Sequence, residues 1–183
     1  MVFEIDMGKF LILDRDGTIN EDRGYIYKVE DMVILPGVLD GLLKFRGTGW
    51  KIIITTNQSG IARKLYTVND LHRFHRHMRG ILVENGIDIE AFFYCPHHPQ
   101  ITGRCQCRKP NTLMVMQAAQ RFGFNPEESI FIGDRDTDIQ LGLNCGGTTV
   151  LIDNGQYPNT VNPHFKAGNI DEAFEILKKA NRA

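Results

Sequence analysis

Five short apolar runs spread along the chain restrict its fold more than any other feature of the sequence. Each run is continuous rather than alternating and is rich in β-branched or aromatic residues, which is typical of strands covered on both faces. Segments with helical spacing separate the runs, so the sequence predicts a parallel sheet with helices on both faces. The runs are Phe10–Leu13, Ile52–Thr55, Phe92–Tyr94, Ile130–Ile132 and Thr149–Ile152.

The clearest predicted helix begins after Thr67. The Thr67 side chain can cap it, and Asp70 stands three residues on, at the position of the acid in a capping box. Apolar residues then recur at helical spacing as far as Leu82. The cationic stretch HRFHRHMRG, residues 72–80, is interpreted as mostly a solvated helix face. Further helices are predicted at residues 37–46, 112–122, 136–144 (capped by Asp136 or Thr137) and 170–179.

Length and charge limit the partners that the chain is expected to have. With 183 residues, a single domain over residues 1–183 is expected. The chain has 21 basic and 22 acidic residues, and this balance gives no electrostatic reason to expect nucleic-acid or anionic-membrane binding. The first residues lack a signal-peptide pattern, and no apolar run approaches the roughly 20 residues of a membrane span. A cytoplasmic location is therefore expected, and we also expect a monomer.

Acidic and polar residues directly follow three of the predicted strands. Asp14 and Asp16 follow the first strand, Thr56 the second and Asp134 the fourth. In parallel α/β sheets ligands bind at the carboxyl ends of the strands. Carboxylates gathered there suit Mg²⁺, which prefers oxygen ligands. Each segment taken alone is also compatible with an ordinary polar turn.

Three of the four cysteines lie in one stretch, CPHHPQITGRCQCRKP, which begins at Cys95. Cys95, His97, Cys105 and Cys107 form a complete tetrahedral set for Zn²⁺ without an open position, which predicts a structural zinc loop over residues 95–107. His98 is an alternative to His97 as the ligand. A disulfide between Cys95 and Cys105 would leave Cys107 over and fits a reducing compartment poorly. A nucleic-acid finger would need a wider basic surface.

The polar strand ends and the cysteine loop together resemble a known superfamily. Four features follow one another along the chain: an apolar strand ending in DRDGT, one ending in Thr56, a later Lys109, and a strand ending in GDRDTD. In this order they resemble the haloacid dehalogenase (HAD) phosphotransferases over roughly residues 9–152. Within that superfamily DRDGTIN, TNQSGIAR and CPHHP with CQCRKP are similar to the D-glycero-D-manno-heptose 1,7-bisphosphate 7-phosphatases. One departure is Lys64, since a glycine often follows IAR in this branch.

This resemblance implies a fold and a set of ligands. The fold would be a Rossmann-like three-layer α/β sandwich with a central parallel sheet and no large cap domain, in which the zinc loop helps to shape the pocket. The zinc ligand would be His97 rather than His98. The implied Mg²⁺ ligands are the carboxylates of Asp14 and Asp134 and the backbone carbonyl of Asp16.

The resemblance also implies an activity, the hydrolysis of a sugar phosphate monoester in the synthesis of heptose precursors such as those of lipopolysaccharide. Asp14 would be the nucleophile that becomes an aspartyl phosphate, and Asp16 the acid and base. Thr56 and Lys109 would stabilise the transferred phosphoryl group. The implied contacts to the rest of the substrate are Asp22, Arg23, Gly24, Tyr25, Asn57, Gln58, Ser59, Arg108 and Arg135.

Other functions stay open at this point. Histidinol-phosphate phosphatases are close relatives of the heptose branch, and the segment GDRDTDIQL is compatible with them. A DNA 3′-phosphatase of the same superfamily is less expected, because the chain is near neutral and has no strand-binding domain. A zinc-stabilised binding module without catalysis would tolerate losses among the residues above, yet all five of Asp14, Asp16, Thr56, Lys109 and Asp134 are present.

Overall fold

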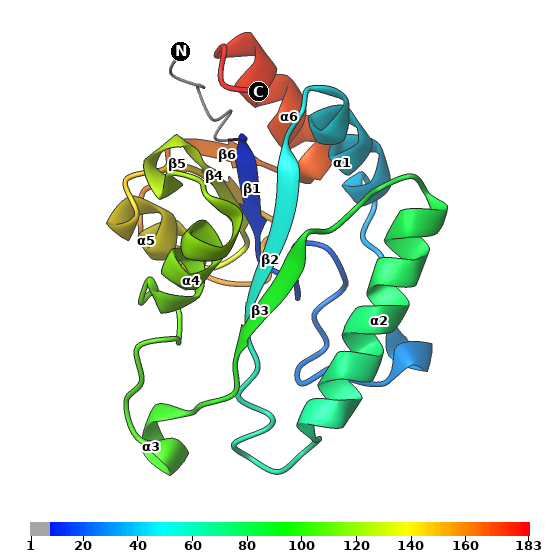
Figure 1. The fold of residues 1–183 in the computed structure, drawn as a ribbon, viewed down its shortest axis with the longest axis vertical. Coiled ribbons are helices and arrows are strands. Elements are labelled where there is room, and N and C mark those ends of the chain that lie inside the picture. Colours follow the sequence, from blue (N-terminus) through cyan, green and yellow to red (C-terminus); the bar gives the residue numbers. More distant parts are fainter. Residues whose placement is uncertain (1–7) are drawn as a thin grey trace, which may run out of the picture.

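All six strands of the computed structural model, which describes residues 8–183, belong to one parallel sheet. The strand order is β3-β2-β1-β4-β5-β6, and each neighbouring pair is parallel (Figure 1). The strands are β1 (Phe10–Leu13), β2 (Lys51–Asn57), β3 (Ala91–Cys95), β4 (Ile130–Gly133), β5 (Thr148–Ile152) and β6 (Phe165–Ala167).

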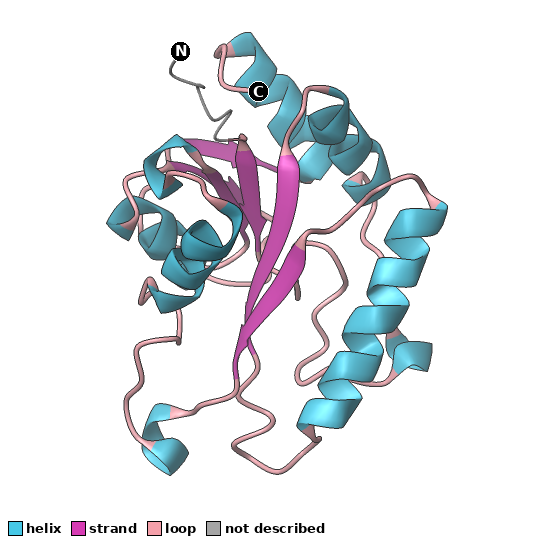
Figure 2. Ribbon diagram, viewed as in Figure 1, coloured by secondary structure: helices cyan, strands magenta, loops and turns pink. Residues whose placement is uncertain are grey.

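Helices cover both faces of the sheet, as the sequence predicts. The helices α1, α2 and α6 lie on one face, and α4 and α5 lie on the other (Figures 1 and 2). The three-layer α/β fold is therefore confirmed, and residues 8–183 contain no large cap domain. The helices are α1 (Val38–Gly47), α2 (Val68–Glu84), α3 (Pro99–Thr102), α4 (Leu113–Phe122), α5 (Asp136–Asn144) and α6 (Ile170–Lys179), with 3-10 turns η1 (Val29–Asp31) and η2 (Pro126–Glu128).

The apolar strands are buried on both faces. In β1, Leu11 and Leu13 belong to the core formed with α1, α2 and α6, whereas Phe10 and Ile12 belong to the core formed with α4 and α5. Successive side chains of a strand point to opposite faces, so only an unbroken apolar run can fill both cores. Full burial of one such side chain stabilises the fold by roughly 1.5–3 kcal/mol.

The strand order creates a crevice between β1 and β4. From β1 the chain continues to β2 and β3 on one side of the sheet, and it later returns to β4 on the other side. Connections that leave in opposite directions open a binding crevice at the carboxyl ends of the strands. Asp14 follows β1, Asp134 follows β4, and Thr56 lies at the end of β2. Residues far apart in the sequence therefore meet at this edge.

Helix α2 is capped as predicted, and its cationic stretch is mostly exposed as predicted, with His75 as the exception among its polar side chains. Thr67 is the N-cap, and Thr67 and Asp70 form the reciprocal bonds of a capping box. Within HRFHRHMRG, His75 is only 6% exposed and stacks on Phe92 of β3 with 4.4 Å between ring centroids. His75 is buried because α2 turns this side chain toward the sheet beside Phe74.

Two further details differ from the sequence prediction. Helix α5 begins at Asp136 with Arg135 as its N-cap, so the predicted caps Asp136 and Thr137 are wrong. The Asp138 carboxylate instead accepts from the backbone N–H of Arg135 at 3.2 Å. The prediction also lacks β6, because a strand of 3 residues is too short to show a periodic pattern.

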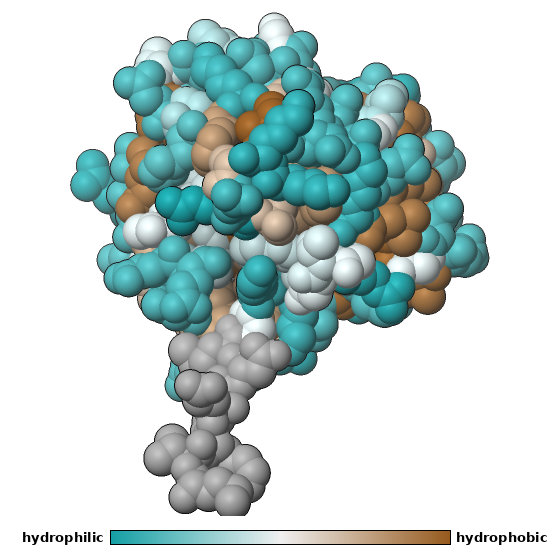
Figure 3. Space-filling model, turned by 90° about the horizontal axis from the view of Figure 1, so that it is seen from above, coloured by the Kyte–Doolittle hydropathy of each residue, from teal (hydrophilic) through white to brown (hydrophobic). Residues whose placement is uncertain are grey.

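The surface at the amino ends of the strands is mostly hydrophilic, with apolar side chains in separate patches (Figure 3). None of the helices within residues 8–183 has the length and hydrophobicity needed to cross a membrane.

Close packing of α1 against α6 leads to a first prediction. A Cβ added at Gly41 would lie 2.6 Å from backbone atoms of Ile170 and Asp171, which cannot move without shifting α6. Gly41→Ala is expected to lower the free energy of unfolding by about 1–3 kcal/mol, measured by urea denaturation. The matched control is Gly80→Ala in α2, where nothing lies within 4 Å, and it should stabilise the protein by roughly 0.5–1 kcal/mol. Equal stability of Gly41→Ala and the wild type would contradict the prediction.

Candidate active site

The predicted site residues converge on a cavity of about 380 Å³ at the carboxyl edge of the sheet. Its walls come from the segments that follow β1, β2 and β4 and from the loop after α3. The predicted residues that line it are Asp14, Asp16, Asp22, Gly24, Tyr25, Thr56, Asn57, Gln58, Ser59, Arg108, Lys109 and Arg135. Arg23 does not line it, because its exposed side chain turns back to pair with Glu21 at 2.5 Å.

Three buried carboxylates lie together at the base of this site. Asp14, Asp134 and Asp138 each offer an oxygen within 4.8 Å of the others. Burial, the largest cause, and the charge of Asp138 raise the pKa of Asp14 to about 6, although the Lys109 ammonium lowers it. Burial and the charges of Asp14 and Asp138 raise the pKa of Asp134 to about 8. The three acids therefore repel one another unless a cation is present.

The same carboxylates fit a divalent cation. Both Asp134 oxygens are buried without a hydrogen-bond partner among the described residues, which is costly unless a ligand satisfies them. Gly17 has φ +82°, and a Cβ there would overlap with the Asp134 carboxylate, so glycine permits the close approach. Hard oxygen donors of this kind suit Mg²⁺. Asp138, which the sequence analysis did not assign, joins Asp14 and Asp134, whereas the assignment of the Asp16 carbonyl stays a prediction.

Lys109 is the counter-charge of the cluster. Its Nζ lies 2.6 Å from Asp14 Oδ1 and 2.6 Å from Asp138 Oδ1, and it donates to the Thr55 carbonyl at 2.8 Å. Burial alone would lower the pKa of Lys109, but the charges of Asp138 and Asp14 outweigh it and raise the pKa above its usual range. Lys109 is thus held charged beside the predicted nucleophile, although only 3% of it is exposed.

A fully buried arginine holds the carboxylate of Asp16. Arg15 donates to Asp16 Oδ1 through Nε at 3.0 Å and through Nη2 at 2.8 Å. Asn20 donates to Oδ1 at 3.0 Å, and Gln58 donates to Oδ2 at 2.9 Å. Asp16 is therefore oriented by several donors and lies outside the three-acid cluster. Arg15 carries no distinguishing pattern in the sequence, so only its burial reveals this role.

Two of the predicted substrate contacts mainly position other groups. Asn57 accepts from the Lys109 backbone N–H at 3.0 Å and donates to its carbonyl at 3.3 Å, which fixes the backbone beside the lysine. Gln58 donates to Thr56 Oγ1 at 2.7 Å and accepts from the Tyr66 hydroxyl at 2.5 Å. The Thr56 hydroxyl accepts from Gln58, so its own hydrogen stays available for a ligand.

An ion pair between Arg135 and Asp22, which we call the rim of the cavity, joins two of its lining segments. Arg135 lies 2.6 Å from Asp22 Oδ2 and stacks over the ring of Tyr157 at 3.9 Å. Tyr157 also donates to Asp22 Oδ2 at 2.8 Å. Burial alone would raise the pKa of Asp22, but hydrogen bonds from Gly24, Tyr157 and Arg135 outweigh it and lower the pKa. Asp22 therefore acts on Arg135 and Tyr157 rather than projecting freely into the cavity.

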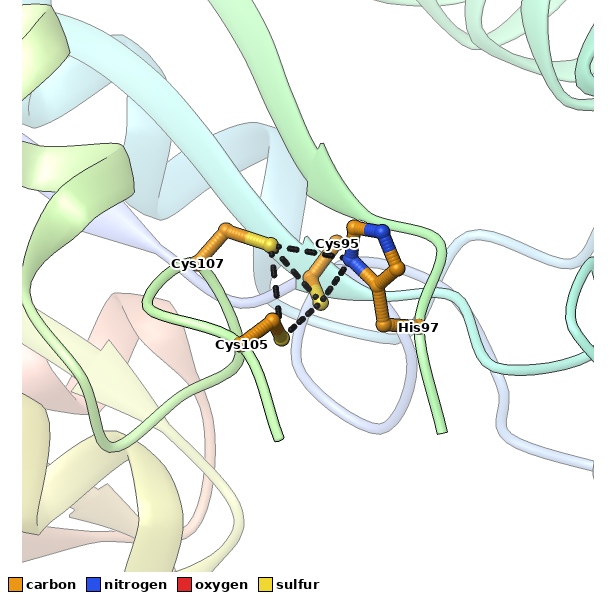
Figure 4. Close-up of side chains that lie close together, drawn as sticks. All are labelled: Cys95, His97, Cys105 and Cys107. Carbon is orange, nitrogen blue, oxygen red and sulfur yellow. Dashed lines mark hydrogen bonds between the residues drawn. The ribbon is translucent and has the colours of Figure 1, made fainter. Parts of the chain in front are cut away.

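The four predicted zinc ligands come together beside this rim (Figure 4). The closest pair of sulfur atoms, Cys95 and Cys107, is 3.1 Å apart, and His97 Nδ1 lies 3.2 Å from Cys107 Sγ. No disulfide links these cysteines, and all are free. Spacings of 3–4 Å are those of donors around a tetrahedral Zn²⁺ with bonds of about 2.0–2.3 Å. The cluster can therefore bind zinc.

His98 lies away from this cluster and contributes to the active-site cavity instead. Its Nε2 is 2.8 Å from a guanidinium nitrogen of Arg63, which also lines the cavity. Arg108 donates to the carbonyl of His97 at 3.3 Å, so the zinc loop directly holds a cavity residue. Lys64, the departure from the branch pattern, has φ 59°. Glycine adopts such a backbone conformation more readily than lysine does, which is consistent with the glycine expected there from the branch pattern.

Comparisons with known proteins identify the family. A Haemophilus influenzae D-glycero-β-D-manno-heptose-1,7-bisphosphate 7-phosphatase is 36% identical over 141 residues, 75% of this chain and 77% of the relative. A Campylobacter jejuni D-glycero-α-D-manno-heptose-1,7-bisphosphate 7-phosphatase is 36% identical over 171 residues, 93% of this chain and 92% of the relative. The chain belongs to the heptose-1,7-bisphosphate 7-phosphatase family. The profile of the HAD-hydrolase-like family also matches residues 106–178.

A solved structure extends the family resemblance to the fold. The D,D-heptose 1,7-bisphosphate phosphatase of B. bronchiseptica, in complex with magnesium and phosphate, has a TM-score of 0.81 and 28% sequence identity. The match covers 94% of this chain and 99% of the other. The fold is therefore the HAD fold expected from the sequence. The individual residue roles within this family site stay predictions.

The carboxylate cluster predicts a pH-dependent response to cations. The folded-state pKa of Asp134, about 8, lies above its unfolded value of 3.8, so the folded state binds more protons between these limits. Without a divalent cation, stability should fall as pH rises from about 4 to about 8. Added Mg²⁺ should raise the Tm more at pH 8 than at pH 5, and Asp134→Asn should flatten both effects. An equal Mg²⁺ shift at both pH values would contradict this.

The zinc cluster predicts a metal content that depends on Cys107. Metal analysis of protein purified without chelators should find equimolar zinc, and Cys107→Ala should lose it because three donors no longer close the tetrahedral shell. Cys145→Ala is the matched control, since Cys145 is buried outside the loop and is not among the four clustered ligands. Unchanged zinc in Cys107→Ala would show that the cluster is not the site.

Proposed function

We propose that the protein is a Mg²⁺-dependent phosphomonoesterase that removes the 7-phosphate of D-glycero-D-manno-heptose 1,7-bisphosphate. The observation that carries this proposal is the buried group of Asp14, Asp134 and Asp138 next to Lys109, at the base of a polar cavity. Membership of the heptose bisphosphate phosphatase family supports the substrate class.

The proposed chemistry proceeds in two displacements at phosphorus. An Asp14 carboxylate oxygen attacks the phosphorus, and the bond to the sugar oxygen breaks while Asp16 protonates that oxygen. Water then attacks the aspartyl phosphate, Asp16 accepts a proton from this water, and phosphate leaves with Asp14 regenerated. Lys109 holds Asp14 in line and offsets negative charge, and the Thr56 hydroxyl donates to a phosphoryl oxygen.

Mg²⁺ would be held by the carboxylates of Asp14, Asp134 and Asp138 and the carbonyl of Asp16, and when bound it screens the repulsion between the carboxylate nucleophile and the phosphate. The B. bronchiseptica complex with magnesium and phosphate supports this ion. Zinc in the Cys95–His97–Cys105–Cys107 cluster would act structurally, since its four protein ligands leave no open position.

Recognition of the second phosphate is assigned to two arginines of the active-site cavity. Arg108 and Arg135 line the cavity, and guanidinium groups bind phosphate through paired hydrogen bonds. When the substrate binds, Arg135 would give up part of its ion pair with Asp22 and bind the second phosphate instead. Because the curated relatives include enzymes named for either anomer, both the α and the β bisphosphate are test substrates. A cytoplasmic location, a monomeric state and a single domain over residues 1–183 stay predictions.

The central test is loss of the nucleophile. Asp14→Asn should lower kcat for phosphate release by more than about 10⁴-fold, because the aspartyl phosphate cannot form without the carboxylate nucleophile. The fold and the zinc content should stay unchanged. Asp88→Asn is the control, because Asp88 pairs with Arg46 on the surface and should retain full activity. Appreciable activity in a clean Asp14→Asn preparation would refute the mechanism.

Substrate comparison separates the heptose enzyme from its nearest alternative. The kcat/KM for heptose 1,7-bisphosphate should exceed that for histidinol phosphate, measured by phosphate release with Mg²⁺. A preference for histidinol phosphate would reject the proposed substrate while leaving the mechanism intact.

A further inference from the structure

A second cavity, of about 300 Å³, lies between α2 and the edge strand β3, and it shares no lining residue with the active-site cavity. We call it the α2–β3 groove. These two elements run beside each other in Figure 1. The residues that line the groove include the cationic or titratable side chains His72, His75, Arg76, Arg79 and Arg121, together with the aromatic Phe92.

The groove gathers positive charge with little to neutralise it. Arg76 and Arg79 extend from α2, and Arg121 extends from the end of α4. None of the three forms an ion pair within residues 8–183. Glu90 is the one acid among the lining residues that the structure describes. Arg79 donates to the Ile89 carbonyl and lies over the ring of Phe92, so Arg76 and Arg121 are the guanidinium groups that favour an anion here, above all a phosphate.

His75 is a mostly buried residue that lines the groove, and one of its ring nitrogens has no hydrogen-bond partner within residues 8–183. His75 is 6% exposed, and its Nε2 lies 3.3 Å from Nη1 of Arg15. A guanidinium can only donate, so Nε2 accepts and the ring proton lies on Nδ1. Within the described part of the chain nothing accepts from Nδ1–H. Burial and the charge of Arg15 lower the pKa of His75 to about 2, which keeps the ring neutral in this form.

The other side of His75 leads to the active site. Arg15 is 0% exposed, and the same guanidinium that donates to His75 also donates to Asp16 Oδ1 and to the Ile26 carbonyl at 3.0 Å. One arginine therefore divides its donors between His75 of the groove and the proposed acid. An acceptor placed on His75 Nδ1–H would make Nε2 a stronger acceptor for Arg15. The hydrogen bonds that Arg15 donates to Asp16 would then change as well.

We propose that the α2–β3 groove binds a small phosphorylated metabolite, whose phosphate accepts from Arg76, Arg121 and His75 Nδ1–H, and that its binding is transmitted to Asp16 through Arg15. The volume is at the lower end of the range for small-molecule sites, which suits a sugar phosphate. Binding in the groove stands independently of the proposed function, whereas transmission to the acid Asp16 rests on it.

Binding is tested by calorimetry with ribose 5-phosphate as the probe, on the zinc-loaded full chain with Mg²⁺ and with Asp14→Asn to prevent turnover. In this background, Arg76→Ala with Arg121→Ala should weaken binding by about tenfold or more, because charge-assisted hydrogen bonds are lost. Arg108→Ala in the active site should leave the affinity unchanged, and ribose without phosphate should not bind. No binding at millimolar probe, or loss of binding with Arg108→Ala alone, would overturn the proposal.

Transmission is tested by steady-state kinetics of the protein with Asp14 intact. Saturating ribose 5-phosphate should change kcat for the bisphosphate at least about twofold and shift its pH profile, with KM unchanged, because Asp16 acts on the leaving group. The Arg76→Ala, Arg121→Ala variant should keep the basal kcat and lose the response. His75→Gln, checked by its thermal melt, should bind the probe more weakly, because the imidazole donor is lost, and its kcat should not respond even when the groove is saturated.

The alternative outcomes separate the two proposals. A rise in KM alone would place the probe in the active site and overturn the inference, as would an unchanged kcat with the groove occupied. Absence of activity on every phosphate ester, with the calorimetric binding intact, would instead reject the proposed function and leave the groove as a phosphate site.

Discussion

The burial of three carboxylates around one lysine is the constraint on which the rest of the structure depends. Asp14, Asp134 and Asp138 lie close enough to raise the pKa values of Asp14 and Asp134, and Lys109 alone cannot offset three negative charges. Such a group is stable only with a further cation or with protons. The crevice between β1 and β4 brings the acids together, and the cores on both faces of the sheet hold them there.

The lysine in turn needs its own support, since it comes from a loop rather than from a strand. Asn57 holds the backbone of Lys109 through two hydrogen bonds, and Cys107 of the zinc cluster lies two residues before it. Arg108, between them, is tied to the carbonyl of the zinc-cluster residue His97. The loop that carries the counter-charge is therefore fastened to β2 on one side and to the cysteine cluster on the other. A structural metal suits such a loop, because loops are otherwise the most mobile part of a fold.

The sequence predicted what depends on local pattern and missed what depends on burial. Continuous apolar runs predicted five of the strands, and the Thr67 capping box was placed correctly, because both are local signals. Asp138 was left without a role, and His75 was not distinguished within a stretch expected to be mostly solvated, because neither position differs in sequence from its exposed neighbours. Arg23 was expected at the cavity, although its exposed side chain pairs with Glu21.

By itself the sequence determined the fold class, the family and the residue types available for chemistry. These follow from strand periodicity and from motifs in which spacing along the chain is sufficient. Only the tertiary structure decided which of these side chains serve a ligand and which hold another residue. Gln58 orients Asp16 and Thr56, and Arg15 connects Asp16 to His75. The physical reason is that a buried polar group must find its partner across the fold, and that partner lies far away in the sequence.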